Sequence, residues 1–190
     1  MTKPAFDKDK LKAAIHYVME RVLDRPSDLG AVKLHKVLWF TDLELMYALD
    51  RTLCGETFLR MAQGPWGSHV DKAIKSLVTA GTIAERQGSS HGYQQRLFFS
   101  LCRPDLSLFS PDEISVLDRM IEIVCFGHTA TSISAATHDR VWQLTPEKGV
   151  MSAAGVFDRL IVPPDEPTRT WASRPLDDAA TSSLAALGLS

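Results

Sequence analysis

The segment 31–49 constrains the fold more than any other part of this 190-residue chain, because it is apolar around nearly its whole circumference when drawn as a helix. At about 100° per residue, four leucines share one face and three other large apolar side chains cover the next. These residues are Leu34, Leu38, Leu45 and Leu49, and then Trp39, Leu43 and Met46. Lys33, Lys36 and Glu44 form the only polar strip. A helix with so little polar surface is buried by its neighbours, so we expect it to be the core of one domain.

Two polar residues, His35 and Asp42, lie one heptad apart inside the apolar arc. An unpaired buried carboxylate costs roughly 1–3 kcal/mol or more, so Asp42 is expected to be buried among hydrogen-bond donors. A catalytic or metal-binding pair is the alternative, which we disfavour because neither a nucleophile nor a third ligand lies at a nearby spacing. We also predict that Asp42 and His138 belong to one polar network beside Trp142. The predicted structural polar core therefore has four members: His35, Asp42, His138 and Trp142.

Composition and charge exclude several classes of protein. With 45% apolar and 23% charged residues, the chain resembles an ordinary soluble globular protein, and its length suits one domain with a substantial core. The net charge of −2 gives no strong overall field towards nucleic acid or a membrane. No apolar run approaches the ~20 residues of a transmembrane helix, and no signal peptide is expected at the polar N-terminus.

The cysteines and the catalytic motifs narrow the function further. Cys54, Cys102 and Cys125 are odd in number and show no CxxC spacing, which argues against a zinc ribbon or a disulfide framework and favours a reducing compartment. We find no Walker, GxGxxG, HExxH or GxSxG sequence. The prediction is a cytoplasmic protein that is not an enzyme and needs neither metal nor cofactor. His16 is expected at the surface of a first helix that ends near residue 23.

Short elements are expected after the central helix. Residues 57–61 alternate enough for a strand, and residues 63–67 predict a rigid turn, because Pro65 fixes its own φ and two glycines free the backbone on either side. A third helix is predicted over 68–80, with Gly81 as the residue that ends it. Two strands, 82–86 and 96–101, then form a hairpin around a polar loop at 87–94. Helix, glycine, strand, loop and strand is also the pattern of a winged helix.

The strongest local signal is the run Ser110, Pro111, Asp112 and Glu113, which predicts a capping box and a proline at the first helical position. A further short helix is expected to begin at Thr129 or Thr131. From residue 163 the composition shifts to Pro, Ser, Thr, Asp and Ala, which predicts a flexible tail over 163–190 and a domain over 1–162.

Three separated motifs in this order resemble the Panacea domain, the SocA-like antitoxin family: KLHKVLWFTDLE, GETFLRMAQGPWGSHV and THDRVWQ. The resemblance covers roughly residues 11–160. It implies a mainly α-helical domain with a small antiparallel sheet, which agrees with the fold class expected from the residues: mainly α (α+β), one compact helical domain with a small antiparallel sheet or hairpin. It also implies an antitoxin, which neutralises a toxin by binding it.

The leading hypothesis is therefore an antitoxin that binds a cognate protein toxin directly. A protease or chaperone is a further expected partner if the toxin is handed on for degradation. We predict a partner-binding site at the turn and the start of the next helix: Gln63, Gly64, Pro65, Trp66 and His69. Trp66 can fill either the core or the partner, and both alternatives stay open. The rival hypothesis is a winged-helix regulator that binds DNA with the 68–80 helix, although basic residues are scattered along the chain.

Overall fold

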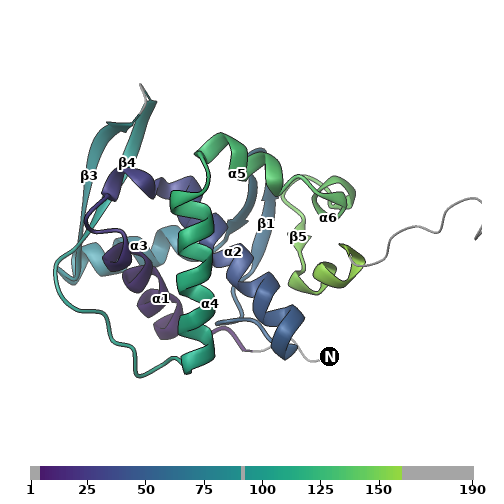
Figure 1. The fold of residues 1–190 in the computed structure, drawn as a ribbon, viewed down its shortest axis with the longest axis horizontal. Coiled ribbons are helices and arrows are strands. Elements are labelled where there is room, and N and C mark those ends of the chain that lie inside the picture. The colour runs from purple at the N-terminus through teal and green to yellow at the C-terminus, as the bar shows by residue number, and fades with distance from the viewer. Residues whose placement is uncertain (1–4, 91–92, 160–190) are drawn as a thin grey trace, which may run out of the picture. The chain divides into compact units, whose positions relative to one another are not determined.

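Helix α2 (Gly30–Leu49) runs through the centre of the fold, and the other elements pack around it (Figure 1). The structure is a computed structural model that describes residues 5–90 and 93–159. Leu34, Val37 and Leu45 have no exposed surface. The prediction of a buried central helix is confirmed, and so is the mainly helical α+β fold.

The predicted polar strip of α2 is only partly correct. Lys33 and Lys36 are buried, and Lys36 has no exposed surface at all, whereas Glu44 reaches the surface and pairs with Arg119. Both lysines donate to backbone carbonyl oxygens inside the fold, Lys33 to Cys125 and Lys36 to Pro65. Neighbouring elements therefore cover the strip that the sequence suggested would face solvent.

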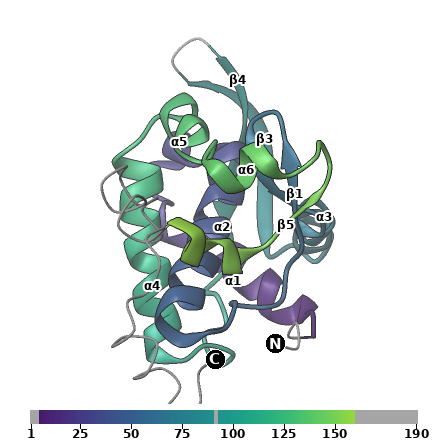
Figure 2. The same ribbon diagram turned by 90° about the vertical axis from the view of Figure 1, so that its right-hand side faces the viewer.

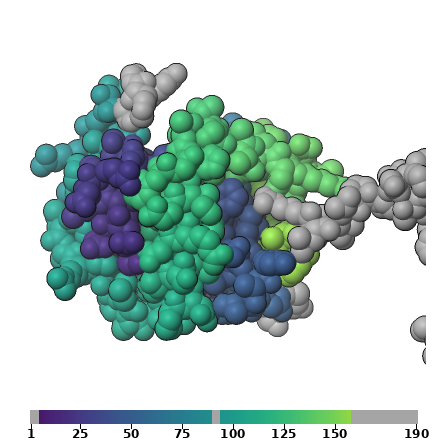
Figure 3. All heavy atoms as spheres, in the orientation of Figure 1, coloured from purple at the N-terminus to yellow at the C-terminus, as the bar shows by residue number. Residues whose placement is uncertain are grey.

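Helix α4 (Pro111–Ile121) packs against α2, α1 (Lys8–Arg21) packs against α4, and the short helix η1 (Pro26–Asp28) connects α1 to α2 (Figure 1). The Asp7 side chain caps α1 by accepting from the backbone N–H groups of Asp9 and Lys10. In the space-filling view, α1 and α4 lie next to each other on this face, and α2 is visible on the other side of α4 (Figure 3). His16 of α1 is buried and contacts Ser100 and the Cys102 carbonyl, so the prediction of a surface histidine is wrong.

A three-stranded antiparallel sheet contains β1 (Phe58–Met61), β2 (Gly64–Gly67) and β5 (Val150–Met151), in the order β2-β1-β5. The predicted rigid turn over 63–67 is therefore wrong: residues 62–63 make the turn, and residues 64–67 pair with β1 in the register Leu59 to Trp66. Pro65 is tolerated because β2 is an edge strand of this sheet. Pairing along β1 outweighs the local turn preference of the Gly-Pro dipeptide.

The second sheet is a two-stranded ribbon of β3 (Ile83–Ser90) and β4 (Tyr93–Ser100). It follows α3 (Val70–Thr79), after which Gly81 adopts a φ of 68°, as a residue that ends a helix requires. The predicted polar loop at 87–94 is wrong in extent, because strand pairing continues to Ser90 and Tyr93. Residues 91–92 lie outside the described part of the chain.

The C-terminal third of the described chain consists of short elements. The capping box that begins α4 is present as predicted, with Ser110 and Glu113 each accepting from the other's backbone N–H. Thr129 caps α5, as expected. The remaining elements are η2 (Glu122–Phe126), a π-helix that the sequence did not predict, α5 (Ala130–Ala136), α6 (Arg140–Leu144) and η3 (Ala153–Arg159).

Residues up to Arg159 form one compact unit, and η3 returns the chain to α2 (Figure 2). The tail predicted over 163–190 lies outside the described residues. All three cysteines are free, as expected from their odd number and spacing.

Candidate protein-interaction site

The structure separates the five residues predicted to bind a partner. Gln63 and His69 are exposed, Trp66 is half-buried, and Gly64 and Pro65 are buried within β2. The exposed members lie at the two ends of the strand, with the buried ones between them. Partner binding by Gln63 and His69 stays a prediction, while Gly64 and Pro65 act inside the fold.

Trp66 is held by contacts within the protein. Its indole stacks on the His35 ring with centroids 3.6 Å apart, and its Nε1 donates to Asp71 Oδ2 at 3.2 Å. Asp71 Oδ1 also accepts a 2.7 Å hydrogen bond from the Arg96 guanidinium. Burial raises the pKa of the Asp71 carboxyl, but the Arg96 hydrogen bond and charge outweigh it, so the net shift is downward. The same guanidinium makes two hydrogen bonds to Glu85. The chain itself therefore uses both polar and aromatic faces of Trp66.

His35 is neutral in the fold. Its Nδ1 accepts a 2.9 Å hydrogen bond from the backbone N–H of Gly67, which places the ring proton on Nε2. Burial lowers the pKa of His35 to about 3. His35 is buried, and this hydrogen bond fixes β2 against α2.

At the other end of β2, Glu56 receives several donors. Its buried Oε1 accepts from the backbone N–H of Thr57 at 2.8 Å and from Ser68 Oγ at 3.0 Å, and it lies 3.1 Å from His69 Nδ1. Ser68 Oγ also lies 3.1 Å from His69 Nδ1. A serine–histidine–acid relay uses both ring nitrogens, so this arrangement does not form such a relay. Glu56 Oε1 instead also accepts from the backbone N–H of His69 at 3.2 Å, just before α3 begins.

The four residues of the predicted polar core lie in separate sets of contacts. Asp42 is buried, and its Oδ1 accepts from the backbone N–H of Leu53 at 2.8 Å, as expected. The single network joining Asp42 to His138 is wrong. His138 instead stacks on Trp142 with centroids 4.0 Å apart, and Trp142 Nε1 donates to the Met61 carbonyl at 3.1 Å. Asp42 therefore binds the loop after α2, whereas Trp142, stacked on His138, binds the last residue of β1.

Lys36 is the functional candidate that sequence reasoning missed. Its Nζ donates to the Pro65 carbonyl at 2.9 Å, and burial lowers the pKa of its amine to about 7. Gly64 lies against it with a φ of 94°, and any side chain there would overlap the Thr137 hydroxyl and meet Lys36 Nζ at 3.0 Å. Glycine is therefore required at this seam between α2, β2 and the end of α5. Because the Pro65 carbonyl meets Lys36 only in the folded chain, no local sequence pattern could have revealed the burial of this lysine.

A shallow groove of about 310 Å³ lies beside this seam. Ser134 Oγ of α5 donates to the Gln63 carbonyl at 2.7 Å, which fixes the β1–β2 turn to α5. The lining side chains are mostly small and exposed: Val32, Gln63, Ala130, Thr131, Ser134, Ala135 and His138. Such a lining leaves room for a side chain that protrudes from another molecule.

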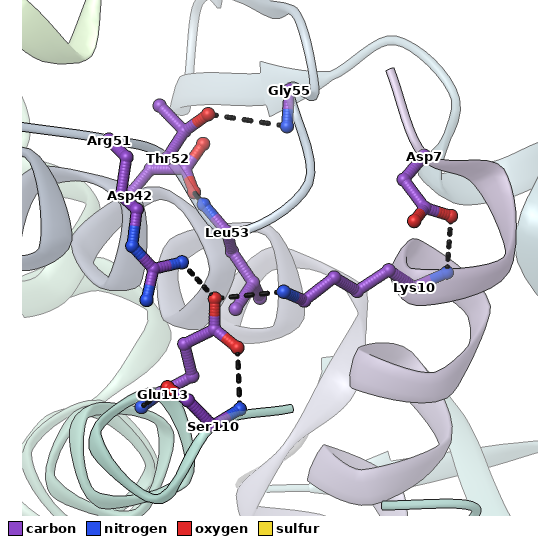
Figure 4. Close-up of polar contacts among 9 residues, drawn as sticks. All are labelled: Asp7, Lys10, Asp42, Arg51, Thr52, Leu53, Gly55, Ser110 and Glu113. Carbon is purple, nitrogen blue, oxygen red and sulfur yellow. Dashed lines mark hydrogen bonds and ion pairs between the residues drawn. The ribbon is translucent and has the colours of Figure 1, made fainter. Parts of the chain in front are cut away.

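A buried carboxylate supports the opposite end of α2 (Figure 4). Glu113 accepts from Lys10 Nζ at 2.8 Å and from Arg51, while its other oxygen accepts from the backbone N–H of Ser110 at 2.9 Å. Burial raises the pKa of Glu113, but these donors outweigh it and the net shift is downward. The ion pairs join α1, the loop after α2 and the start of α4.

The family described as "Antitoxin SocA-like, Panacea domain" matches residues 34–143, which is more than half of the chain. The chain belongs to the SocA-like Panacea family. No curated protein and no solved structure matches it. The Panacea match is shorter than the span of 11–160 over which the sequence resembles the family, and it leaves α1 outside.

The Panacea segment contains Lys36, Gln63 and five of the other groove residues, and of the lining only Val32 precedes it. It also contains Glu113, whose partner Lys10 comes from α1. Within residues 5–90 and 93–159, no three His, Cys, Asp or Glu side chains are grouped as a metal site would require. No described helix is both long and apolar enough to cross a bilayer.

Proposed function

We propose that this protein is an antitoxin that neutralises a cognate toxin by binding it directly. The observation that carries the proposal is the match to the SocA-like antitoxin family over residues 34–143. The fold agrees with a binding role, because these buried polar groups hold its own elements together: Lys36 binds β2, Asp42 binds the loop after α2, and Glu113 joins the start of α4 to α1. We further propose that it acts in the cytoplasm, where a protease or chaperone could receive the bound toxin.

The groove beside Gln63 is the proposed anchor point for the toxin. Its rim is set by α5 and by the turn between β1 and β2, which the Ser134–Gln63 hydrogen bond holds together. A preformed rim loses little conformational entropy on binding. An aromatic or aliphatic side chain of the toxin would fit against Ala130, Ala135 and Val32. His69 lies at the far end of β2 and would contact the rim of the interface.

The test is coexpression with the protein encoded by the neighbouring open reading frame, first shown to be toxic alone. The proposal expects growth to be restored and the two proteins to copurify. Ala135→Arg fills the groove from an exposed position and should abolish both effects, whereas Lys72→Glu on the exposed face of α3 is the matched control. Restored growth without a complex would contradict direct binding.

DNA binding is the second candidate, favoured by the order of α3, β3 and β4 and by the exposed Lys72 and Lys75 on α3. Asp71 and Glu85 reduce the local positive charge, since both bind Arg96. Titration against the protein's own promoter DNA at several salt concentrations separates the candidates, because binding through phosphates weakens steeply with salt.

A further inference from the structure

The β3–β4 ribbon carries apolar side chains on the side opposite Phe98: Leu97 and Phe99 are half-buried there, and Gln95 on the same side donates to the Ser27 carbonyl of η1. Phe98 of β4 and Ile83 of β3 are buried on the inner side, where Arg96 also binds Asp71 and Glu85. Side chains alternate along a strand, so Leu97 and Phe99 lie on the outer side. Leu101 follows in the same alternation and is 59% exposed. An antiparallel sheet with one solvated face normally carries polar residues there, so Leu97, Phe99 and Leu101 make this end of the outer side unusually apolar.

Strand β3 completes the surface. Ala84 pairs with Phe99 and Arg86 pairs with Leu97, so both lie on the outer side. Leu97 leans across Gly88, where any side chain would overlap it, and the Arg86 guanidinium lies 5.9 Å from the centre of the Phe99 ring. We call this surface the ribbon face: Ala84, Arg86, Leu97, Phe99 and Leu101.

The charge at the ribbon face is positive and unbalanced. Arg86 is exposed, as is Arg103 just beyond Leu101, and neither takes part in an ion pair among the described residues. Glu85, the acidic neighbour of Arg86, points to the inner side and binds Arg96. A partner that covers the apolar strip would therefore gain by bringing a carboxylate to Arg86.

We infer that the ribbon face is a docking surface for the toxin, taking an apolar segment flanked by at least one acidic side chain. The inference rests on the proposed function and adds a second contact to the groove beside Gln63. Apolar contact supplies affinity, and pairing with Arg86 supplies orientation and selectivity.

Two other occupants fit less well. A second copy packed about a two-fold axis would bring the same basic residues together, because such an interface uses one patch twice and this patch contains no carboxylate. The end of the described chain, η3, lies on the opposite side of the domain from β3 and β4 (Figures 1 and 2).

The experiment measures the Kd of the purified full-length protein for the toxic product of the neighbouring open reading frame. Arg86→Glu and Leu101→Ser test the ribbon face, and both positions are exposed, so the thermal midpoint should not change. The matched controls are Arg140→Glu and Leu144→Ser, since Leu144 is 73% exposed and Arg140 is exposed without an ion pair. Each ribbon variant should weaken binding by roughly 10- to 30-fold, and the controls by less than about twofold.

Ribbon variants that bind as tightly as the wild type would overturn this inference while leaving the proposed function intact. A wild-type protein that does not bind the toxin would overturn both. If the wild type self-associates, and Leu101→Ser abolishes that self-association while toxin binding is unchanged, a second copy occupies the face and the inference fails. If removal of residues 163–190 exposes the face to an apolar dye, the chain's own C-terminal segment occupies it, and the inference also fails.

Discussion

Lys36 Nζ lies 2.9 Å from the carbonyl oxygen of Pro65 in a position without solvent exposure, and no described carboxylate pairs with it. The amine joins the central helix to the edge strand β2 at the point where Gly64 meets Thr137. A lysine in this position costs stability whenever it is protonated, because burial disfavours the charged form.

Replacing Lys36 with methionine should stabilise the protein near neutral pH. The pKa of Lys36 is about 7 in the fold and ordinarily 10.5, so the unfolded chain binds the extra proton between these values and wild-type stability rises with pH across that window. Lys36→Met should raise the free energy of unfolding by roughly 1–3 kcal/mol at pH 6 and by much less at pH 10. This net gain already subtracts the lost hydrogen bond to Pro65.

Urea unfolding at pH 6, 8 and 10 measures this effect. Lys72→Met on the exposed face of α3 is the control and should follow the wild type at every pH. A Lys36→Met variant with the same pH dependence as the wild type would show that Lys36 is not the group that titrates.

Asp42→Asn should have the opposite pH dependence. Burial raises the pKa of Asp42 from 3.8 to about 7 in the fold, although the Leu53 N–H opposes the shift. The folded state therefore binds more protons between pH 3.8 and 7, and the wild type loses stability as pH rises through that window. Asparagine keeps an oxygen for Leu53 and carries no charge. The variant should gain about 1–3 kcal/mol over the wild type at pH 8 and little at pH 4.

Thermal or urea unfolding at these two pH values checks the Asp42 prediction, with Asp24→Asn on the surface as the control. A variant that is less stable than the wild type at both pH values would mean that the charged carboxylate is needed by the Leu53 loop.

Trp66→Ala should destabilise the fold by about 2–4 kcal/mol, because it removes the stack on His35 and the donor to Asp71 and opens a cavity beside a buried imidazole. Trp66→Phe keeps the stack and should lose less. The midpoint of thermal unfolding distinguishes the two alternatives that the sequence left open. An unchanged midpoint together with lost toxin binding would make Trp66 a partner anchor after all.

Glu113→Gln should weaken the joint between α1 and α4 at neutral pH. The pKa of Glu113 lies below its ordinary 4.5, so its contribution is complete above that value and disappears as pH falls through the lowered folded value. We expect a loss of about 1–3 kcal/mol at pH 7 and a smaller loss at pH 3, because the carboxylate of the wild type takes up protons as pH falls. Stability that differs equally from the wild type at both pH values would show that packing, and not charge, is responsible.

The sequence predicted what depends on neighbours along the chain. The capping box at Ser110 and Glu113 is visible because both partners lie within one turn, and Gly81 is placed by the helix that it ends. The burial of α2 follows from its own composition. These features are local, so propensity and periodicity describe them well.

The features that the sequence did not predict depend on contacts between residues that only folding brings together. Residues 64–67 prefer a turn in isolation, and only pairing with β1 makes them a strand. The burial of His16 is not visible in the sequence because its partners, Ser100 and Cys102, lie more than 80 positions away. Lys36 and the outward strip of Leu97 and Phe99 were missed for the same reason, since each depends on which side of an element faces the core.

The central claim, that neutralisation occurs by direct contact, is tested most directly by calorimetric titration of the purified toxin from the neighbouring open reading frame with this protein at low and high salt. The account predicts saturable binding at both salt concentrations, weakened by Ala135→Arg and by Arg86→Glu. Restored growth in cells with no heat of binding at either salt concentration would contradict it.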